Sequence, residues 1–145
     1  MADNGKIDWV IAVEEIKQLM AKYCHGIDKH NEELFMSIWS DDAEYILPRG
    51  EGKGTEGVLA LVRKVWTQVT KCHHHITNPI IEVNGDRASA VTDVFYFRLT
   101  ADGVNCLLSG GYNLDFVKVD GEWKISRMEF VPFVDTTPVF AENPA

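Results

Sequence analysis

The sequence has little of what marks several large classes of protein. Only three cysteines and five prolines occur among its 145 residues. Cys24, Cys72 and Cys106 are odd in number and lack metal-site spacing, so a disulfide framework does not fit and a reducing compartment is expected. Near the N-terminus the longest apolar run, residues 9–13, is too short for the core of a signal peptide. We therefore expect a cytoplasmic protein that is neither exported nor anchored in a membrane.

Basic residues are also scarce. Lysine and arginine number 14 against 22 aspartate and glutamate residues, which gives a formal net charge of -8. Because phosphate binding needs clustered basic side chains, a nucleic-acid partner is not expected. The sequence also contains neither the glycine pattern of dinucleotide-binding turns nor a phosphate-binding loop. We expect no nucleotide and no other cofactor.

What the chain does contain is typical of a single soluble domain over residues 1–145. Its hydrophobic content is 46% and its charged content 25%. In three segments the apolar residues recur at steps of three and four, which predicts amphipathic helices. These expected helices span residues 13–27, 32–39 with Asn31 as N-cap, and 58–69.

The remaining segments are rich in β-branched and aromatic residues, which favour strands. The expected strands span residues 43–47, 74–83, 88–100, 106–119 and 122–133, while residues 48–57, with four glycines, are expected to form a loop. Short turn sequences such as Asp120-Gly121 join the later strands into an antiparallel meander. Helices must cover one face of such a sheet, so we predict an α+β fold whose curved antiparallel sheet encloses a pocket. The tail, residues 134–145, is expected to be extended.

Two residues far apart in the sequence, Asp28 and His74, suggest proton-transfer chemistry. Asp28 lies near the buried stripe of the first expected helix, although a solvated charge or a cap is the ordinary role of such a residue. Strand alternation places His74 on one face and His73 and His75 on the other, so the three histidines cannot form one metal cluster. No metal site is expected, and a carboxylate beside an imidazole is sufficient to move a proton without a cofactor.

Several motifs in this order resemble the SnoaL-like family of the nuclear transport factor 2-like superfamily. They are the helix with Tyr23 and Asp28, the stretches at residues 38–45, 74–79 and 85–86, and the stretch Gly121-Glu122-Trp123-Lys124-Ile125. The resemblance covers about residues 8–133 and implies a cystatin-like fold, a cone-shaped α+β barrel of antiparallel sheet around three helices. It is strongest to the branch with hexachlorocyclohexane dehydrochlorinase, scytalone dehydratase and the bile-acid dehydratases.

The resemblance also implies roles for particular residues. Asp28 and His74 match the catalytic dyad of that branch. Tyr23 matches a catalytic tyrosine of the bile-acid dehydratases where the dehydrochlorinase has a lysine, which counts against dehydrochlorination. Tyr23 and Asp28 lie about 140° apart around an ideal helix, so they do not share a face, and Tyr23 is equally interpreted as a core residue. The branch tends to form trimers, so we expect a homotrimer, with a dimer as the alternative.

Four further residues are candidates for substrate binding: Tyr45, Arg127, Trp39 and Asn78. Tyr45 and Arg127 lie on expected strands where they could point inward, Trp39 lines the core or the pocket, and Asn78 follows His74 at even spacing. Each of them also has an ordinary structural interpretation. Aromatic residues that line a pocket would imply an apolar substrate. Taken together with the dyad, they lead us to expect a small, apolar and cyclic one.

Three functions remain open at this point. One is a cofactor-free dehydratase, another lyase or an isomerase that uses the Asp28 and His74 dyad. A second is a polyketide cyclase or ketosteroid isomerase type of enzyme, in which the carboxylate alone is the base. The third is a non-catalytic ligand-binding module or the small subunit of a ring-hydroxylating oxygenase.

Overall fold

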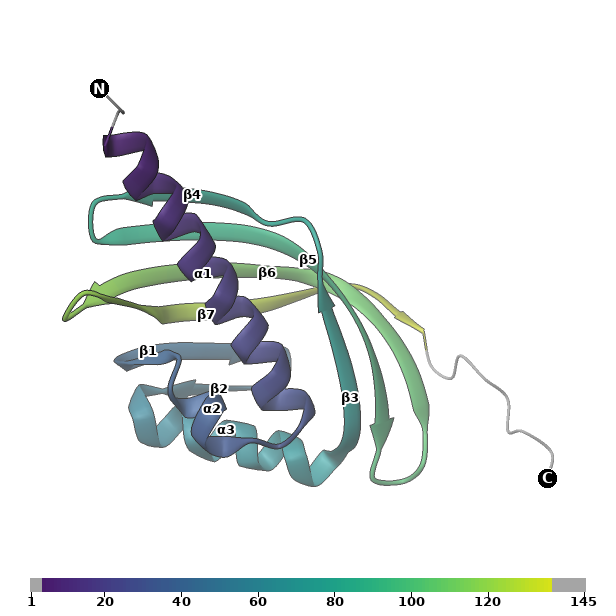
Figure 1. The fold of residues 1–145 in the computed structure, drawn as a ribbon. Coiled ribbons are helices and arrows are strands. Elements are labelled where there is room, and N and C mark those ends of the chain that lie inside the picture. Colours follow the sequence, from purple (N-terminus) through teal and green to yellow (C-terminus); the bar gives the residue numbers. More distant parts are fainter. Residues whose placement is uncertain (1–3, 137–145) are drawn as a thin grey trace.

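A strongly curved sheet with a long helix across its concave face dominates the molecule (Figure 1). The computed structural model describes residues 4–136. The helices are α1 (Asn4–Asp28), α2 (Glu32–Met36) and α3 (Gly54–Gln68). The strands are β1 (Trp39–Leu47), β2 (Gly50–Lys53), β3 (Val69–Ile76), β4 (Ile80–Asn84), β5 (Arg87–Thr100), β6 (Asn105–Val119) and β7 (Glu122–Thr136). The α+β class predicted from the sequence is confirmed.

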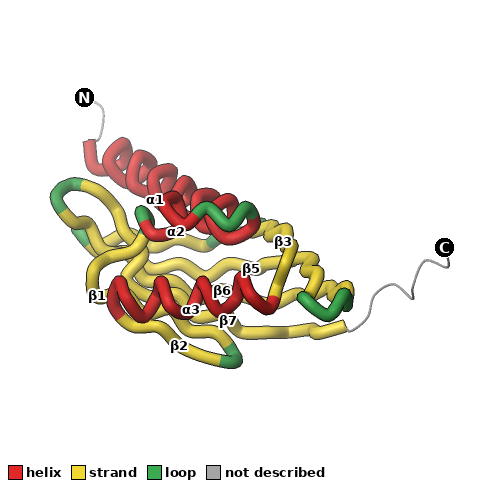
Figure 2. Tube along the Cα trace, turned by 90° about the horizontal axis from the view of Figure 1, so that it is seen from below, coloured by secondary structure: helices red, strands yellow, loops and turns green. Residues whose placement is uncertain are grey.

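The sheet is mixed and open, where a purely antiparallel barrel was expected. Its strand order is β2-β1-β7-β6-β5-β3, with β4 also paired with β5. Strand β1 runs parallel to β7, with Glu44 beside Arg127, while the other pairs are antiparallel. The antiparallel expectation is wrong for this pair because no hairpin joins β1 to β7. Most of the chain lies between these two strands, and such a long connection allows them to run parallel. Within residues 4–136 the edge strands β2 and β3 do not pair with each other, so the sheet does not close. Helix α3 packs against both of them (Figure 2).

Two boundaries near the start of the sheet differ from the sequence prediction. Helix α2 ends at Met36, and Trp39 is the first residue of β1 instead of the last of a helix. The expected loop at residues 48–57 contains β2, which pairs with β1, and the first residues of α3. Gly52 permits this arrangement, since a Cβ there would lie 2.3 Å from the carbonyl oxygen of Gly57. From the sequence these glycines predict a loop, but in the structure they allow β2 to lie against α3.

The strand predicted over residues 74–83 is two strands, β3 and β4. Both pair with β5, but with different parts of it. The chain leaves regular pairing at residues 77–79, where Pro79 has no N–H to donate. Asn78 stabilises the break, because its side chain donates to Asp93 Oδ2 at 2.8 Å and accepts from the Asp93 N–H at 3.0 Å.

The core lies between the concave face of the sheet and the helices. Even-numbered residues of β5 and β6 are buried there, and aromatic side chains from several elements fill the centre. The largest fully buried side chains include Tyr23, Tyr45, Phe35, Phe116 and Ile16. Within the described residues, no helix combines the length and apolar character needed to cross a membrane. Of the predicted extended tail, residues 134–136 continue β7 and the rest lies outside the described residues.

Candidate active site

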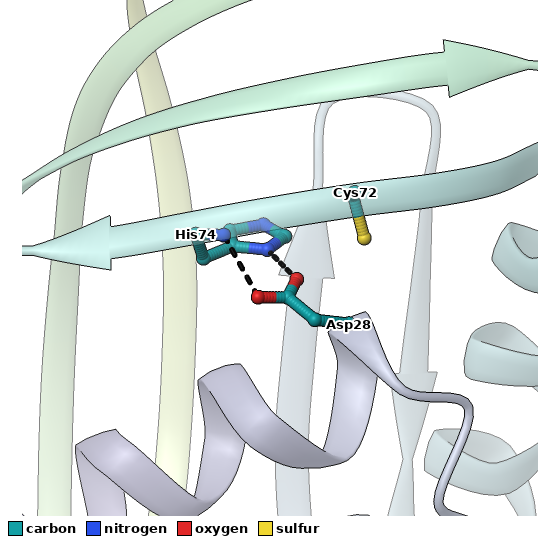
Figure 3. A group of neighbouring side chains, drawn as sticks. All are labelled: Asp28, Cys72 and His74. Atoms are coloured by element: carbon teal, nitrogen blue, oxygen red, sulfur yellow. Dashed lines mark hydrogen bonds and ion pairs between the residues drawn. The ribbon is translucent and has the colours of Figure 1, made fainter.

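Asp28 and His74 meet at the point where the end of α1 reaches the C-terminal half of β3 (Figure 3). His74 Nδ1 lies 2.5 Å from Asp28 Oδ1, and the His74 backbone N–H donates to Asp28 Oδ2 at 2.8 Å. The two side chains are only 6% and 8% exposed. Each oxygen of the carboxylate therefore accepts a hydrogen bond from the same histidine, which fixes the orientation of the imidazole.

The chain around Asp28 is built to present it to β3. Helix α1 ends at Asp28, and Trp66 Nε1 donates to the carbonyl of Ile27 at 3.0 Å, which anchors this last turn. Gly26 lets α2 approach closely, because a Cβ there would lie 2.9 Å from Phe35 Cα. The Gly26 position is therefore explained by helix packing and not by a distortion of α1.

Electrostatics keep Asp28 ionised. Burial raises the pKa of its carboxyl, but the hydrogen bonds and charge of His74, with a further hydrogen bond from Cys72, outweigh burial and leave the pKa below its ordinary value. An ionised Asp28 can only accept, so the Nδ1 atom of His74 carries a proton. In the neutral imidazole this leaves Nε2 as the acceptor, which is the form that a general base requires.

Tyr23 lies beside the dyad within a group of buried tyrosines. Its hydroxyl is 2.9 Å from that of Tyr45 and 3.3 Å from that of Tyr112. Its ring meets the His74 ring edge-on, with centroids 6.0 Å apart. The angular separation of Tyr23 and Asp28 along α1 is accommodated because Asp28 reaches β3 while Tyr23 points into the core. Burial raises the pKa of all three tyrosines, so they remain protonated and can donate.

Sequence reasoning missed two members of this arrangement, Tyr96 and Tyr112. Tyr96 stacks on His74, with ring centroids 4.4 Å apart and an interplanar angle of 16°. It lies directly opposite His74 in the pairing of β3 with β5, while Tyr112 lies on β6. Alternation on their strands indicates that both face inward, but only the pairing of strands distant in the sequence brings them to the dyad.

The predicted substrate-binding residues are divided between the two faces of the sheet. Trp39 and Tyr45 are buried in the core, with ring centroids 5.1 Å apart. Arg127 lies on the outer face, where it binds Glu129 at 2.8 Å and lies 3.9 Å from Glu44. Asn78 is exposed and bonded to Asp93. The structure does not bring Arg127 or Asn78 to the dyad.

A β-bulge explains the position of Arg127. Opposite β6, Phe116 pairs with Ile125 but Asp115 pairs with Arg127, so Ser126 is an extra residue in β7. One extra residue reverses the alternation of all that follow. Arg127 therefore points outward, and Met128 takes the buried position. Asn78 differs for another reason, since β3 ends at Ile76 and alternation no longer applies.

Cys72 adds a third possible ligand atom beside the dyad (Figure 3). Its sulfur, an Asp28 oxygen and a His74 nitrogen all lie within 4.8 Å of one another. Burial, together with the hydrogen bond to Asp28, raises the pKa of the Cys72 thiol well above its usual range. Because a metal ligand must be a thiolate, a metal ion here would have to displace both that proton and the proton on Nδ1. We therefore assign Cys72 as a hydrogen-bond donor to Asp28.

Comparison with known proteins identifies relatives over nearly the whole chain. The sequence model described as the SnoaL-like domain matches residues 10–129. Hexachlorocyclohexane dehydrochlorinase 1 of Sphingobium indicum is 31% identical over 126 residues, which cover 84% of this chain and 82% of that protein. The crystal structure of a type 2 hexachlorocyclohexane dehydrochlorinase matches with a TM-score of 0.88 at 28% identity, over 97% of this chain and 99% of that one.

A more distant structure bears on the fold alone. A Nostoc punctiforme protein of unknown function with a cystatin-like fold matches with a TM-score of 0.73 at 20% identity, covering 82% of this chain and 89% of that one. The cystatin-like architecture and the family resemblance predicted from sequence motifs are thus both confirmed.

Proposed function

The chain belongs to the SnoaL-like domain family, and on that premise we propose that it is a cofactor-free dehydratase in which Asp28 and His74 transfer the proton. Its dehydrochlorinase relatives support an enzyme of the lyase type, which forms a double bond by elimination. The dyad, the leaving group and the substrate are our proposal. We propose a small, apolar and cyclic substrate, because the interior around the dyad is aromatic.

The buried contact between Asp28 and His74 carries the proposal. Both carboxylate oxygens of Asp28 accept hydrogen bonds from His74, Cys72 donates a further one, and the side chain is only 8% exposed, so little of the carboxylate is left to approach a substrate. A carboxylate-only isomerase or cyclase would need a free oxygen on Asp28. The arrangement therefore favours the imidazole as base, with Asp28 as the residue that orients it and stabilises its protonated form.

The proposed reaction proceeds by proton abstraction and loss of hydroxide. His74 Nε2 takes a proton from the carbon next to a carbonyl group, and the electron pair of that C–H bond moves toward the carbonyl. The carbon–carbon double bond then forms as the bond to the β-hydroxyl breaks. A tyrosine hydroxyl protonates the departing hydroxide, and the proton held by His74 returns through the tyrosine network, so that the sum is substrate to alkene plus water.

The tyrosines favour water over chloride as the leaving group. Hydroxide needs a proton to depart, whereas chloride departs as the anion and needs none. Tyr23 shares a hydroxyl network with Tyr45 and Tyr112, and all three remain protonated because they are buried. We therefore propose Tyr23 as the general acid.

Turnover of a substrate panel tests this function. We would follow elimination by ultraviolet absorbance with cyclic β-hydroxy ketones and hydroxysteroid thioesters, using wild type, Asp28→Asn, His74→Ala and Tyr23→Phe. His73→Ala is the matched control, since His73 lies on the outer face of the same strand. The dyad mechanism requires turnover by wild type and a loss of at least about 10²-fold in the Asp28 and His74 variants.

Two other outcomes would favour different functions. Activity that survives His74→Ala but not Asp28→Asn would favour a carboxylate-only enzyme. No turnover across the panel, together with copurification of a larger protein, would favour the oxygenase subunit or a binding module.

We also propose that the chain forms a homotrimer through the outer face of the sheet. Val91, Phe95 and Phe97 are 51%, 40% and 42% exposed on neighbouring positions of β5. Exposed apolar groups of this kind favour burial against another chain. Light scattering coupled to size-exclusion chromatography measures the mass directly, and a mass of one chain would contradict the proposal.

A further inference from the structure

Arg98 lies on the concave face of the sheet, next to the pair of residues that contains His74. In the register of the sheet, Cys72 pairs with Arg98, which pairs with Cys106 on the other side. The adjacent row contains His74 opposite Tyr96. Even-numbered residues of these strands face inward, so the side chain of Arg98 shares a face with His74 and Tyr96.

This arginine has no anionic partner in the part of the chain that the structure describes. It is half-buried, its Nε atom is buried without a hydrogen-bond partner, and no ion pair includes it. Its neighbours across the strands are thiols and not carboxylates. A buried guanidinium N–H that is left unpaired is costly, so this arrangement needs a reason.

Two of the other arginines, Arg63 and Arg127, are ion-paired, while Arg49 and Arg87 are exposed to solvent. Arg63 binds Glu32 through two hydrogen bonds of 2.8 and 2.7 Å, and Arg127 binds Glu129 at 2.8 Å. Both pairs lie outside the concave face. Arg98 differs from these four arginines because its Nε atom is buried without a hydrogen-bond partner beside the site, where a ligand can supply the missing acceptor.

We propose that Arg98 binds a carboxylate on the substrate, so that the substrates are small rings that are apolar except for one carboxylate. Arg98 lies diagonally opposite His74 on the neighbouring strand. Residues in this arrangement are roughly 7–8 Å apart, which is about the length of one six-membered ring with its substituent. A ring could therefore present its reacting C–H to His74 while its carboxylate binds the guanidinium of Arg98. The positive charge of Arg98 would also stabilise the negative charge that develops on the substrate during proton abstraction.

This inference deepens the proposed function and adds a substrate class to it, but its test does not depend on turnover. Benzoate and benzamide have nearly the same shape and differ in charge. We would measure the Kd of each by calorimetry and would follow the Arg98 Nε–H signal by nitrogen NMR. Wild type should bind benzoate roughly 10- to 100-fold more tightly than benzamide, with a shift of the Arg98 signal.

Two variants distinguish binding at Arg98 from a general effect of the net charge of the protein. Arg98→Met should abolish the preference for benzoate, while Arg127→Met, with the same change of charge on the outer face, should retain it. His74→Ala should also retain it, which separates this proposal from the catalytic one. Failure of wild type to bind benzoate, equal affinity for both probes, or a preference that survives Arg98→Met would overturn the assignment. Thermal melts confirm that each variant is folded, and Arg98→Lys, which keeps the charge, should keep part of the preference.

Discussion

The two faces of β3 place histidines in different surroundings. His74 faces the helices, is 9% exposed, and is held by Asp28 and stacked on Tyr96. His73 and His75 face outward, with their rings 4.4 Å apart, and have no carboxylate partner among the described residues. The identity of the residue is therefore not what makes His74 special. A partner supplied by α1 gives one histidine of three a defined tautomer and orientation.

The largest effect should come from removing the inner histidine alone. We expect His74→Ala to lose about 10²- to 10⁴-fold in kcat/KM on any substrate that wild type turns over, because a general base is lost. His73→Ala and His75→Ala should retain activity within about twofold, since nothing on the outer face acts on the inner site. Steady-state kinetics of the three variants measure the contrast. Similar losses in all three would mean that the histidines act through folding.

The next effect concerns the charge of Asp28. We expect Asp28→Asn to lower the free energy of unfolding by about 1.5–3 kcal/mol at pH 7, the size of a hydrogen bond to a charged group. Since the pKa of Asp28 is lower in the folded state, its contribution is present above the ordinary value of 3.8 and is lost as the pH falls below it. Urea unfolding of both proteins at several pH values from 7 to 3 measures the difference. A difference that stays constant at low pH would contradict an ionised Asp28.

A smaller effect is expected for the tyrosine network. Tyr23→Phe removes one hydroxyl but leaves the ring, so Tyr45 and Tyr112 lose a common partner. We expect a loss of about 1–2 kcal/mol in unfolding free energy. Activity should fall by about 10-fold or more if Tyr23 is the general acid. Retained activity with reduced stability would assign Tyr23 a structural role only.

The smallest effect on the fold itself should come from the outer face. Phe97→Ser replaces a side chain that is 42% exposed and packs against Phe95, so the unfolding free energy of the isolated chain should fall by only about 1 kcal/mol. The mass measured by light scattering should nevertheless fall if this face joins the subunits. An unchanged assembly would place the interface elsewhere.

Much of the fold could be predicted from local patterns. Helical periodicity identified the three helices, and turn sequences identified the long hairpins of β5, β6 and β7. The missed features depend on distant partners. Nothing near Trp39 indicates that β1 joins β7 in parallel, and the short strand β2 forms because its glycines approach α3. Such non-local pairing is set by packing and not by propensity.

The site shows the same division. Alternation placed His74 apart from its two neighbours, and family motifs matched it with Asp28. Alternation then failed at Arg127, because the extra residue Ser126 reverses the face of β7. Tyr96 and Arg98 were overlooked, because a strand pattern gives their direction but not the strand that lies opposite them. The register of β3 on β5 supplies that information.

The parallel pairing of β1 with β7 also governs when the molecule can be completed during synthesis. Strands β1 and β2 leave the ribosome early, yet β1 joins the rest of the sheet only through β7, the last strand of the described chain. Contacts between segments so distant in sequence form slowly, because the intervening chain must be ordered first. Until β7 has emerged, Tyr45 has no sheet to hold its strand beside Tyr23. The interior that contains Tyr23 and Tyr45 is therefore a late product of folding, and a chain cut short before β7 cannot assemble it.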